Sequence, residues 1–481
     1  MADSAPAEIP WRVAVVGGGL AGLAAVHHLH ELCAQNQRPR EIVMFESSSR
    51  PGGIVGTRDV AGYRVELGAD SFITNKPWAV DLCRRLGIDG RLIPTNAQYR
   101  RSLVLRNGKP VAVPEGFQLL APVSIGAVLG SPLFSWPGKL RMACEYFVPR
   151  GKPDGDESLA SFVKRRLGRE ALERLVQPLV GGIYTSDPEK LSLRATMPRF
   201  LEMERAHGSL IRALRWQQRA GRNEDSAASG ARYGLFTTPA GGISELVEAL
   251  AGKVAEQALV RCDSEVLGVT RAAESSQYVL NLAGSKQETF DAVVLAVPAY
   301  RAARLIASFA APAAEKLERI EYASTAIVVS GHKLADIRHP LEAFGLVIPA
   351  IEKRRILAVS FTSRKFPGRA PEGCVQLRTF VGGAMQSELM QLSGDEILAL
   401  VREELEDILG VTWKPDFAIL ARWMRSMPQY HVGHLDLIAG IEHELSGFPN
   451  LALAGHAYNG VGIPDTIHSG EMAAERVFAS M

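Results

Sequence analysis

Apolar residues at the start of the chain follow a strand–helix–strand pattern. Residues 12–16 form a short apolar run, which predicts a buried strand. Helical spacing of apolar residues predicts a helix from Leu20 to about Leu32, and residues 41–46 predict a second strand. The sequence therefore predicts a βαβ unit with parallel strands at the beginning of the chain.

The apolar pattern continues with strands and ends in a helix. Residues 260–270 and 291–298 predict strands that return to the first sheet, and residues 450–454 predict its last strand. Strand-like runs alternate with turns from about 320 to 430, which indicates a second, sheet-based lobe. Helical spacing over residues 463–480 predicts a final helix.

The middle of the chain has a helical pattern and one uncharged segment. Residues 158–179 have the spacing of an amphipathic helix, and the polar residues 219–232 predict a linker. Residues 116–138 carry no charge, but prolines and glycines interrupt them, so a membrane-spanning helix is not expected. We interpret this segment as short helices that rest in one membrane leaflet; a helical subdomain core is the alternative.

Composition and charge exclude several classes of protein. The 481 residues include 54 basic and 52 acidic ones, a balance that argues against a nucleic-acid-binding protein. The five cysteines form no CxxC pair, which argues against a disulfide framework or a zinc site and fits a reducing cytoplasm. We predict no metal site, because His431-x-x-His434 has no nearby Cys or carboxylate support.

A glycine motif between the first strand and helix predicts a dinucleotide site. In Gly17-x-Gly19-x-x-Gly22, the first glycine permits a tight turn, the second lets the backbone approach a pyrophosphate, and the third lets helix and strand pack closely. Free N–H groups of the helix would face the phosphates. Glu46 ends the second strand, where a carboxylate can bind the ribose hydroxyls.

Further glycines favour FAD over NAD as the dinucleotide. Gly52 and Gly53 follow Glu46 closely and would bring a second loop against the same cofactor, which NAD enzymes do not need. The small residues at 68–71 would allow close approach to a flat ring. The last strand ends at Gly455 and leads through a glycine-rich stretch into the final helix, which offers a second helix N-terminus to the cofactor.

Motifs along the whole chain carry a more specific resemblance. Val15-Val16-Gly17-Gly18-Gly19, Glu66-Leu67-Gly68-Ala69-Asp70-Ser71-Phe72 and Ala296-Val297-Pro298 resemble the flavin-containing amine oxidase superfamily. Arg422-Trp423, Met427-Pro428-Gln429-Tyr430 and Gly460-Val461-Gly462-Ile463-Pro464 together resemble the protoporphyrinogen and coproporphyrinogen III oxidase family within it. Two positions depart from common patterns: Ile54 stands where many superfamily members have Arg, and Asp70 where some members have Asn.

The resemblance implies a set of site residues. Val266 would place its backbone on the adenine, and Trp423 would line the isoalloxazine with residues 461–463. Val347 and Phe380 would sandwich a tetrapyrrole, and Arg100 or Arg101 would bind one of its propionates. The non-covalently bound FAD would be contacted by Gly17, Gly18, Gly19, Gly22, Glu46, Ser47, Gly52, Gly53, Gly68, Ala69, Asp70, Ser71, Val266, Trp423, Gly455, Val461, Gly462 and Ile463.

The resemblance also implies an activity in haem biosynthesis. Protoporphyrinogen IX, or coproporphyrinogen III, would lose six electrons in three two-electron steps to the flavin N5, with O2 as the oxidant. No protein side chain is required as a catalytic residue, because the flavin carries the redox chemistry. The alternatives are an amine oxidase or carotenoid-type desaturase on the same scaffold, and a non-catalytic FAD-binding partner protein. The oligomeric state is left open.

The predicted fold class is α/β (α+β), with three domains. A Rossmann-like FAD-binding domain takes residues 1–98, 231–305 and 440–481. A sheet-based substrate-binding domain takes residues 99–114 and 306–439. Residues 115–230 form a helical, membrane-facing subdomain. We expect a cytoplasmic protein that contacts the inner face of the cell membrane peripherally.

Overall fold

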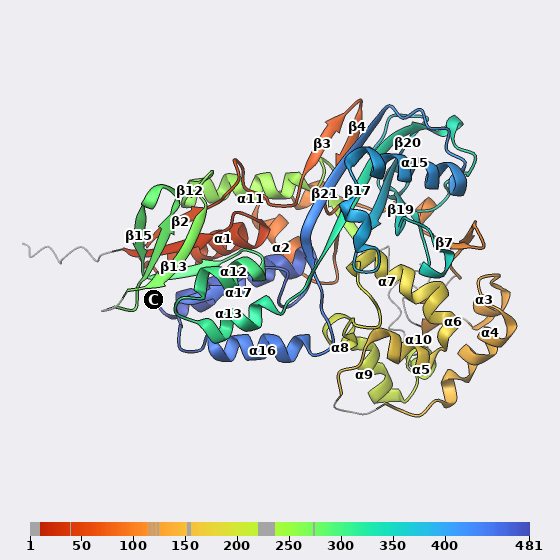
Figure 1. The fold of residues 1–481 in the computed structure, drawn as a ribbon, viewed down its shortest axis with the longest axis horizontal. Coiled ribbons are helices and arrows are strands. Elements are labelled where there is room, and N and C mark those ends of the chain that lie inside the picture. The colour runs from red at the N-terminus through yellow and green to blue at the C-terminus, as the bar shows by residue number, and fades with distance from the viewer. Residues whose placement is uncertain are drawn as a thin grey trace, which may run out of the picture.

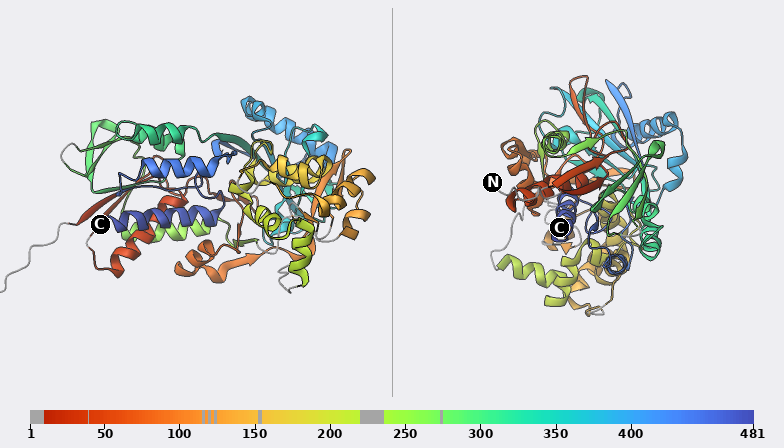
Figure 2. Two further views of the ribbon diagram at one scale, coloured as in Figure 1. Left: turned by 90° about the horizontal axis from the view of Figure 1, so that it is seen from below. Right: turned by 90° about the vertical axis from the view of Figure 1, so that its left-hand side faces the viewer.

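The computed structural model describes residues 10–38, 40–114, 117–118, 121–122, 125–151, 155–219, 236–272 and 275–481. The molecule is elongated, with a parallel sheet and its helices at one end (Figures 1 and 2). A large, mostly antiparallel sheet and a group of short helices occupy the other end. All of the predicted linker 219–232 except Arg219, and parts of the uncharged segment 116–138, lie outside the described residues.

The first unit is built on a five-stranded parallel sheet of order β12-β2-β1-β16-β22. The central strand β1 (Trp11–Val16) pairs with β2 (Arg40–Phe45) and β16 (Ala292–Leu295). The edges are β12 (Leu259–Arg261) and β22 (Leu451–Leu453). These strands are apolar on both faces because both faces are covered.

Helices cover one face of this sheet. α1 (Leu20–Gln35), α11 (Ser244–Gln257) and α17 (Ile463–Ala479) share one hydrophobic core with the strands. Helices α1 and α17 come from opposite ends of the chain and lie side by side in both views of Figure 2. Both begin near the carboxyl ends of the parallel strands, so two helix N-termini approach the same edge of the sheet.

The opposite face is covered by α12 (Ala299–Ile306) and a small antiparallel sheet in which β13 pairs with β14 (Tyr278–Leu282) and β14 with β15 (Gln287–Phe290). Its first strand, β13 (Val266–Arg271), corrects one expectation, since residues 260–270 do not form a single strand. The chain turns at Asp263, whose φ is +49°, and β12 and β13 enter different sheets. The apolar pattern alone does not show this turn, because no glycine or proline marks it.

The second unit is a seven-stranded sheet of order β21-β17-β20-β19-β18-β7-β8. Helix α15 (Gly394–Leu409) begins with a capping box at Ser393 and covers one face. The strands are β7 (Ser102–Arg106), β8 (Lys109–Ala112), β17 (Tyr322–Lys333), β18 (Gly345–Val347), β19 (Ala358–Phe361), β20 (Cys374–Gly382) and β21 (Phe417–Pro428).

The third unit consists of short helices with a core of their own, packed against β7 and β18. The helix predicted over residues 158–179 is interrupted. α5 (Leu159–Arg166) ends before Gly168, whose φ of +94° breaks the helix. Helical backbone resumes with α6 (Arg169–Ala171) and runs through a π-helical segment, Leu172–Val176, into α7 (Gln177–Tyr184). None of the described helices combines the length and the apolar character needed to cross a bilayer.

The predicted fold class is confirmed: helices and sheets are mixed, with a Rossmann-like parallel sheet and a second unit built on a sheet.

Candidate functional site

The glycine motif forms a tight loop between β1 and α1. Gly17 has a φ of +106°, and a side chain there would run into the Ala296 carbonyl oxygen. A Cβ at Gly22 would collide with the Gly17 carbonyl oxygen, so this glycine lets the helix pack on the loop. A side chain at Gly19, the N-cap of α1, would point into open space. The loop therefore leaves room beside the helix N-terminus, as a bound phosphate requires.

Glu46 and the second glycine pair meet this loop. The Gly18 N–H donates to Glu46 Oε2 at 2.7 Å, and the Gly52 N–H donates to the Gly18 carbonyl at 2.8 Å. A Cβ on Gly53 would lie 3.3 Å from Gly19 Cα, so only a residue without a side chain fits there easily. The structure thus brings together the residues that the two glycine motifs contributed to the predicted cofactor site.

A pocket of about 300 Å³ opens beside the glycine loop. Three residues that we predicted to contact FAD, namely Gly17, Ser47 and Val266, contribute to its wall. The complete lining is Val16, Gly17, Phe45, Ser47, Ser264, Glu265, Val266, Leu267, Val297, Tyr300, Arg301, Arg304, Leu305 and Arg425. The pocket has the size of a small ligand site and lies at the carboxyl ends of β1 and β2.

The loop 68–71 follows β4 (Tyr63–Glu66) and carries a buried ion-pair cluster. Asp70 lies 3.0 Å from Lys365 Nζ and 3.2 Å from Arg378 Nη1, and Arg378 also donates to the Gly68 carbonyl. Burial favours a raised pKa for Asp70, but the charges of Lys365 and Arg378 outweigh it and hold the pKa well below its ordinary value. Ser71 Oγ lies within 2.8 Å of Asp70 and 2.9 Å of Lys365.

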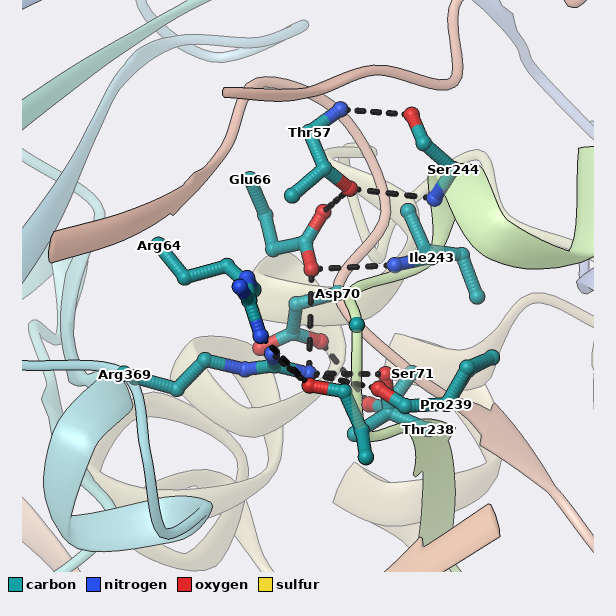
Figure 3. A network of polar contacts seen from close by, with 12 residues as sticks. Thr57, Arg64, Glu66, Asp70, Ser71, Thr238, Pro239, Ile243, Ser244 and Arg369 are labelled. Atoms are coloured by element: carbon teal, nitrogen blue, oxygen red, sulfur yellow. Dashed lines mark hydrogen bonds and ion pairs between the residues drawn. The ribbon is translucent and has the colours of Figure 1, made fainter. Parts of the chain in front are cut away.

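A second buried network holds the strand before this loop (Figure 3). Glu66 accepts hydrogen bonds from Thr57 Oγ1 at 2.7 Å and from the Ile243 N–H at 3.0 Å. Arg369 lies opposite and donates to Thr238 Oγ1 and to backbone carbonyls of Pro239 and Ala240. These contacts fix the end of β4, and with it the position of the loop 68–71, between the two sheets.

Trp423 and the C-terminal segment complete the surroundings of this loop. The Trp423 indole N–H donates to the Leu67 carbonyl at 2.8 Å. Gly455 has a φ of +136° and its N–H donates to Ser469 Oγ on α17. Gly462 is the N-cap of α17, with Val461 and Ile463 on either side, packed against the helical unit and the first core.

Two of the predicted substrate residues, Val347 and Phe380, lie on the same face of the large sheet, because both pair with Ala358. Val347 ends β18 and packs against the core of the helical unit, near Gly182 of α7. Phe380 is partly buried on β20, with the Arg378 guanidinium 5.4 Å from its ring centroid. Arg100 is partly buried, and its Nε has no hydrogen-bond partner among the described residues, whereas Arg101 is exposed.

Several residues at the site were not predicted. Lys365 and Arg378 neutralise Asp70, but nothing in the sequence near them indicates this role, which depends on the pairing of distant elements. Tyr300 and Arg425 line the pocket beside the glycine loop. Arg425 lies between two recognised motifs, directly before Ser426, so its place in the sequence could have indicated it.

Comparisons with known proteins cover nearly the whole chain. Residues 20–478 match the family model described as flavin containing amine oxidoreductase. The chain is 33% identical to the coproporphyrinogen III oxidase of Bacillus subtilis, over 96% of this chain and 97% of that protein. It is 31% identical to the coproporphyrinogen III oxidase of Staphylococcus aureus, over 98% and 99% of the two chains.

A solved structure has the same fold. It belongs to an Exiguobacterium sp. 255-15 protein that carries a provisional assignment as a protoporphyrinogen oxidase. The two structures superpose with a TM-score of 0.86 at 28% sequence identity, over 98% of this chain and 99% of the other.

Proposed function

The chain belongs to the family of flavin-containing amine oxidoreductases, and on this premise we propose that it is an oxidase of porphyrinogens in haem biosynthesis. The observation that carries the proposal is full-length similarity to coproporphyrinogen III oxidases, together with the porphyrinogen-oxidase motifs at residues 422–430 and 460–464. The similarity spans the flavin region and the substrate region alike, so both are expected to be preserved.

We propose that the flavin is FAD, bound without a covalent bond. The open space at Gly19, the two helix N-termini and the pocket at Ser47 and Val266 suit an extended dinucleotide. The loop 68–71 and Trp423 lie beside one another and suit the flat ring. When bound, the flavin supplies the hydride acceptor for the reaction.

The protein's own residues orient the substrate and shield it from water. Val347 and Phe380 lie on two strands of the second sheet and would contact the faces of the tetrapyrrole. Arg100, with its unpaired and buried Nε, suits a propionate better than the exposed Arg101. The porphyrinogen releases its own pyrrole protons as it becomes conjugated, so the mechanism requires no protein base.

The reaction proposed is the loss of six electrons in three two-electron steps, with O2 as the final oxidant. The similarity to coproporphyrinogen III oxidases favours coproporphyrinogen III over protoporphyrinogen IX as the substrate. An amine oxidase, a carotenoid-type desaturase and a non-catalytic flavin carrier are the alternatives, and none has a specific structural observation in its favour.

We also propose the three domains predicted from the sequence and a peripheral contact with the membrane. Separate hydrophobic cores in the three units support the division. Exposed apolar side chains on the helical unit, among them Trp136, Leu140 and Phe147, support the membrane contact. The expected location is the cytoplasm, at the inner face of the cell membrane.

Porphyrin fluorescence tests the activity directly. Protein loaded with FAD is given each porphyrinogen separately in air, with FAD alone as the control for autoxidation. We expect a rate far above autoxidation, and a faster rate with coproporphyrinogen III. No rise with either substrate, in protein that binds flavin, would contradict the proposed function, and a faster rate with protoporphyrinogen IX would reverse the choice of substrate.

A further inference from the structure

The pocket beside the glycine loop has an outer wall made by an aromatic ring and a cation. Tyr300, in the first turn of α12, and Arg425, near the end of β21, both line it. The Arg425 guanidinium carbon lies 4.1 Å from the centroid of the Tyr300 ring, and Tyr322 meets the same ring edge-on at 5.2 Å. The Tyr300 ring therefore holds the arginine side chain at the pocket, and Tyr322 packs against Tyr300 from the side.

A backbone irregularity brings Arg425 to this wall. Strands β17 and β21 shift in register between Ala323 and Thr325. Arg425 has a φ of +46°, in the left-handed region, and its N–H donates to Ser324 Oγ at 2.9 Å. Trp423, two residues earlier, contacts the Leu67 carbonyl instead. One irregular segment thus contacts both the loop 68–71 and the pocket beside the glycine loop.

The charge of Arg425 is not neutralised by any carboxylate among the residues that the structure describes. Arg301, on the same rim, differs because it pairs with Glu265 at 3.6 Å. Arg50, beside the second glycine pair, donates to the Pro51 and Val55 carbonyls. Arg425 therefore offers its charge to a ligand in the pocket that it lines.

We propose that Arg425, held by Tyr300, binds the phosphate groups in the ADP half of the FAD. The inference rests on the proposed function, which names FAD as the cofactor. A guanidinium group can bind two phosphate oxygens at once, which suits it for this contact. The adenosine would occupy the rest of this pocket, which Ser47 and Val266 line.

Binding measurements on the full-length protein test the inference. FAD binding is followed by quenching of flavin fluorescence, and ADP and adenosine are added separately as competitors. We expect Arg425→Gln to raise the dissociation constants of FAD and ADP by about tenfold and to leave that of adenosine unchanged. Tyr300→Leu should also weaken the binding of ADP, because it removes the ring that holds the arginine.

Arg319→Gln is the matched control, since Arg319 is exposed and does not line the pocket. Circular dichroism establishes that each variant is folded. Unchanged FAD and ADP binding in Arg425→Gln would overturn the inference, and so would an equal loss of adenosine binding, which would place the arginine on the base. Failure of the unaltered protein to bind any FAD would instead overturn the proposed function, so the two failures are distinguishable.

Discussion

Arg369 Nη2 and Glu66 Oε1 lie 3.8 Å apart, and neither side chain is exposed to solvent. Glu66 ends β4 next to the loop 68–71, whereas Arg369 lies in the segment between β19 and β20 of the large sheet. Figure 3 shows the two side chains among hydrogen-bonding groups from four segments of the chain. The pair therefore links the loop predicted to face the flavin with the sheet predicted to hold the substrate.

Removal of Arg369 is expected to destabilise the protein strongly. Arg369→Met leaves the buried Glu66 carboxylate without its cation and removes the hydrogen bonds that Arg369 donates to the Pro239 and Ala240 carbonyls. Breaking a buried ion pair in this way costs about 3–5 kcal/mol. The free energy of unfolding, measured in urea, should fall by about this amount.

The control for this variant is Arg84→Met. Arg84 pairs with Asp81 at the surface, where both side chains are about half exposed or more, so its loss should cost less than about 1 kcal/mol. Equal effects of the two variants would contradict the structural role assigned to Arg369.

Asp70→Asn is expected to make the bound flavin easier to reduce. The substitution removes one negative charge beside the loop 68–71 and leaves the positive charges of Lys365 and Arg378 in place. A more positive surrounding stabilises a reduced, more negative flavin, so its midpoint potential should rise by about 30 mV, equal to about 1.4 kcal/mol for two electrons. Spectroelectrochemistry measures the potential.

Asp407→Asn provides the control for this charge change. Asp407 pairs with Arg354 and is largely exposed, so its variant should have the potential of the unaltered protein. A potential that stays the same or falls in Asp70→Asn would place the cluster away from the flavin.

His332 is expected to make stability depend on pH in the acidic range. Burial lowers the pKa of His332 from 6.5 to about 4. The unfolded chain therefore takes up a proton near pH 6.5, whereas the folded chain does so only near pH 4, so this contribution to stability is present at neutral pH and is lost as the pH falls between these values. The loss amounts to about 3 kcal/mol.

His332→Gln separates this contribution from other titrating groups, because glutamine does not titrate and can still bond to Ser330 Oγ. The difference in unfolding free energy between the unaltered protein and the variant should shrink between pH 7 and pH 4. A difference that does not change with pH would show that His332 titrates normally in the folded protein.

Local patterns predicted much of the fold, because each pattern reflects burial on a particular element. The βαβ unit at the start and the helix α17 at the end follow from apolar spacing and glycine positions. The prediction of a single strand over residues 260–270 was wrong, because the chain turns at Asp263 and no glycine marks that turn. The interrupted helix at Gly168 was missed because the apolar spacing continues beyond it.

Sequence motifs indicate which residues come together where one motif carries the geometry, but not where distant segments meet. Gly17 and Gly52 have positive φ angles and Gly22 packs against the Gly17 carbonyl, and the glycine spacing indicates both requirements. The contact of Lys365 with Asp70 depends instead on how two units pack, and no local spacing encodes it. The roles of Arg100, Val347 and Phe380 toward the substrate stay predictions.

The apolar patch on the helical unit is expected to bind lipid. Trp136 is 73% exposed and Phe147 80% exposed, with Leu140 between them in sequence, and the Lys139 ammonium group lies 4.8 Å from the Trp136 ring centroid. Lys139 itself is buried and donates to the Leu129 carbonyl, so the exposed apolar side chains are what suits this surface to a membrane. In co-sedimentation with vesicles of phosphatidylglycerol and phosphatidylcholine, the triple variant Trp136→Ser, Leu140→Ser, Phe147→Ser should bind several-fold more weakly than the unaltered protein.

The matched control for this experiment removes exposed apolar residues elsewhere on the molecule. Leu259 and Leu267 are 50% and 60% exposed and belong to the unit built on the parallel sheet, so Leu259→Ser, Leu267→Ser should leave vesicle binding unchanged. Equal losses in both variants would mean that vesicles bind apolar surface without preference. Absence of vesicle binding by the unaltered protein would contradict the membrane contact. The patch would then be a surface for another protein, because an exposed apolar cluster of this kind lowers solubility unless it is covered.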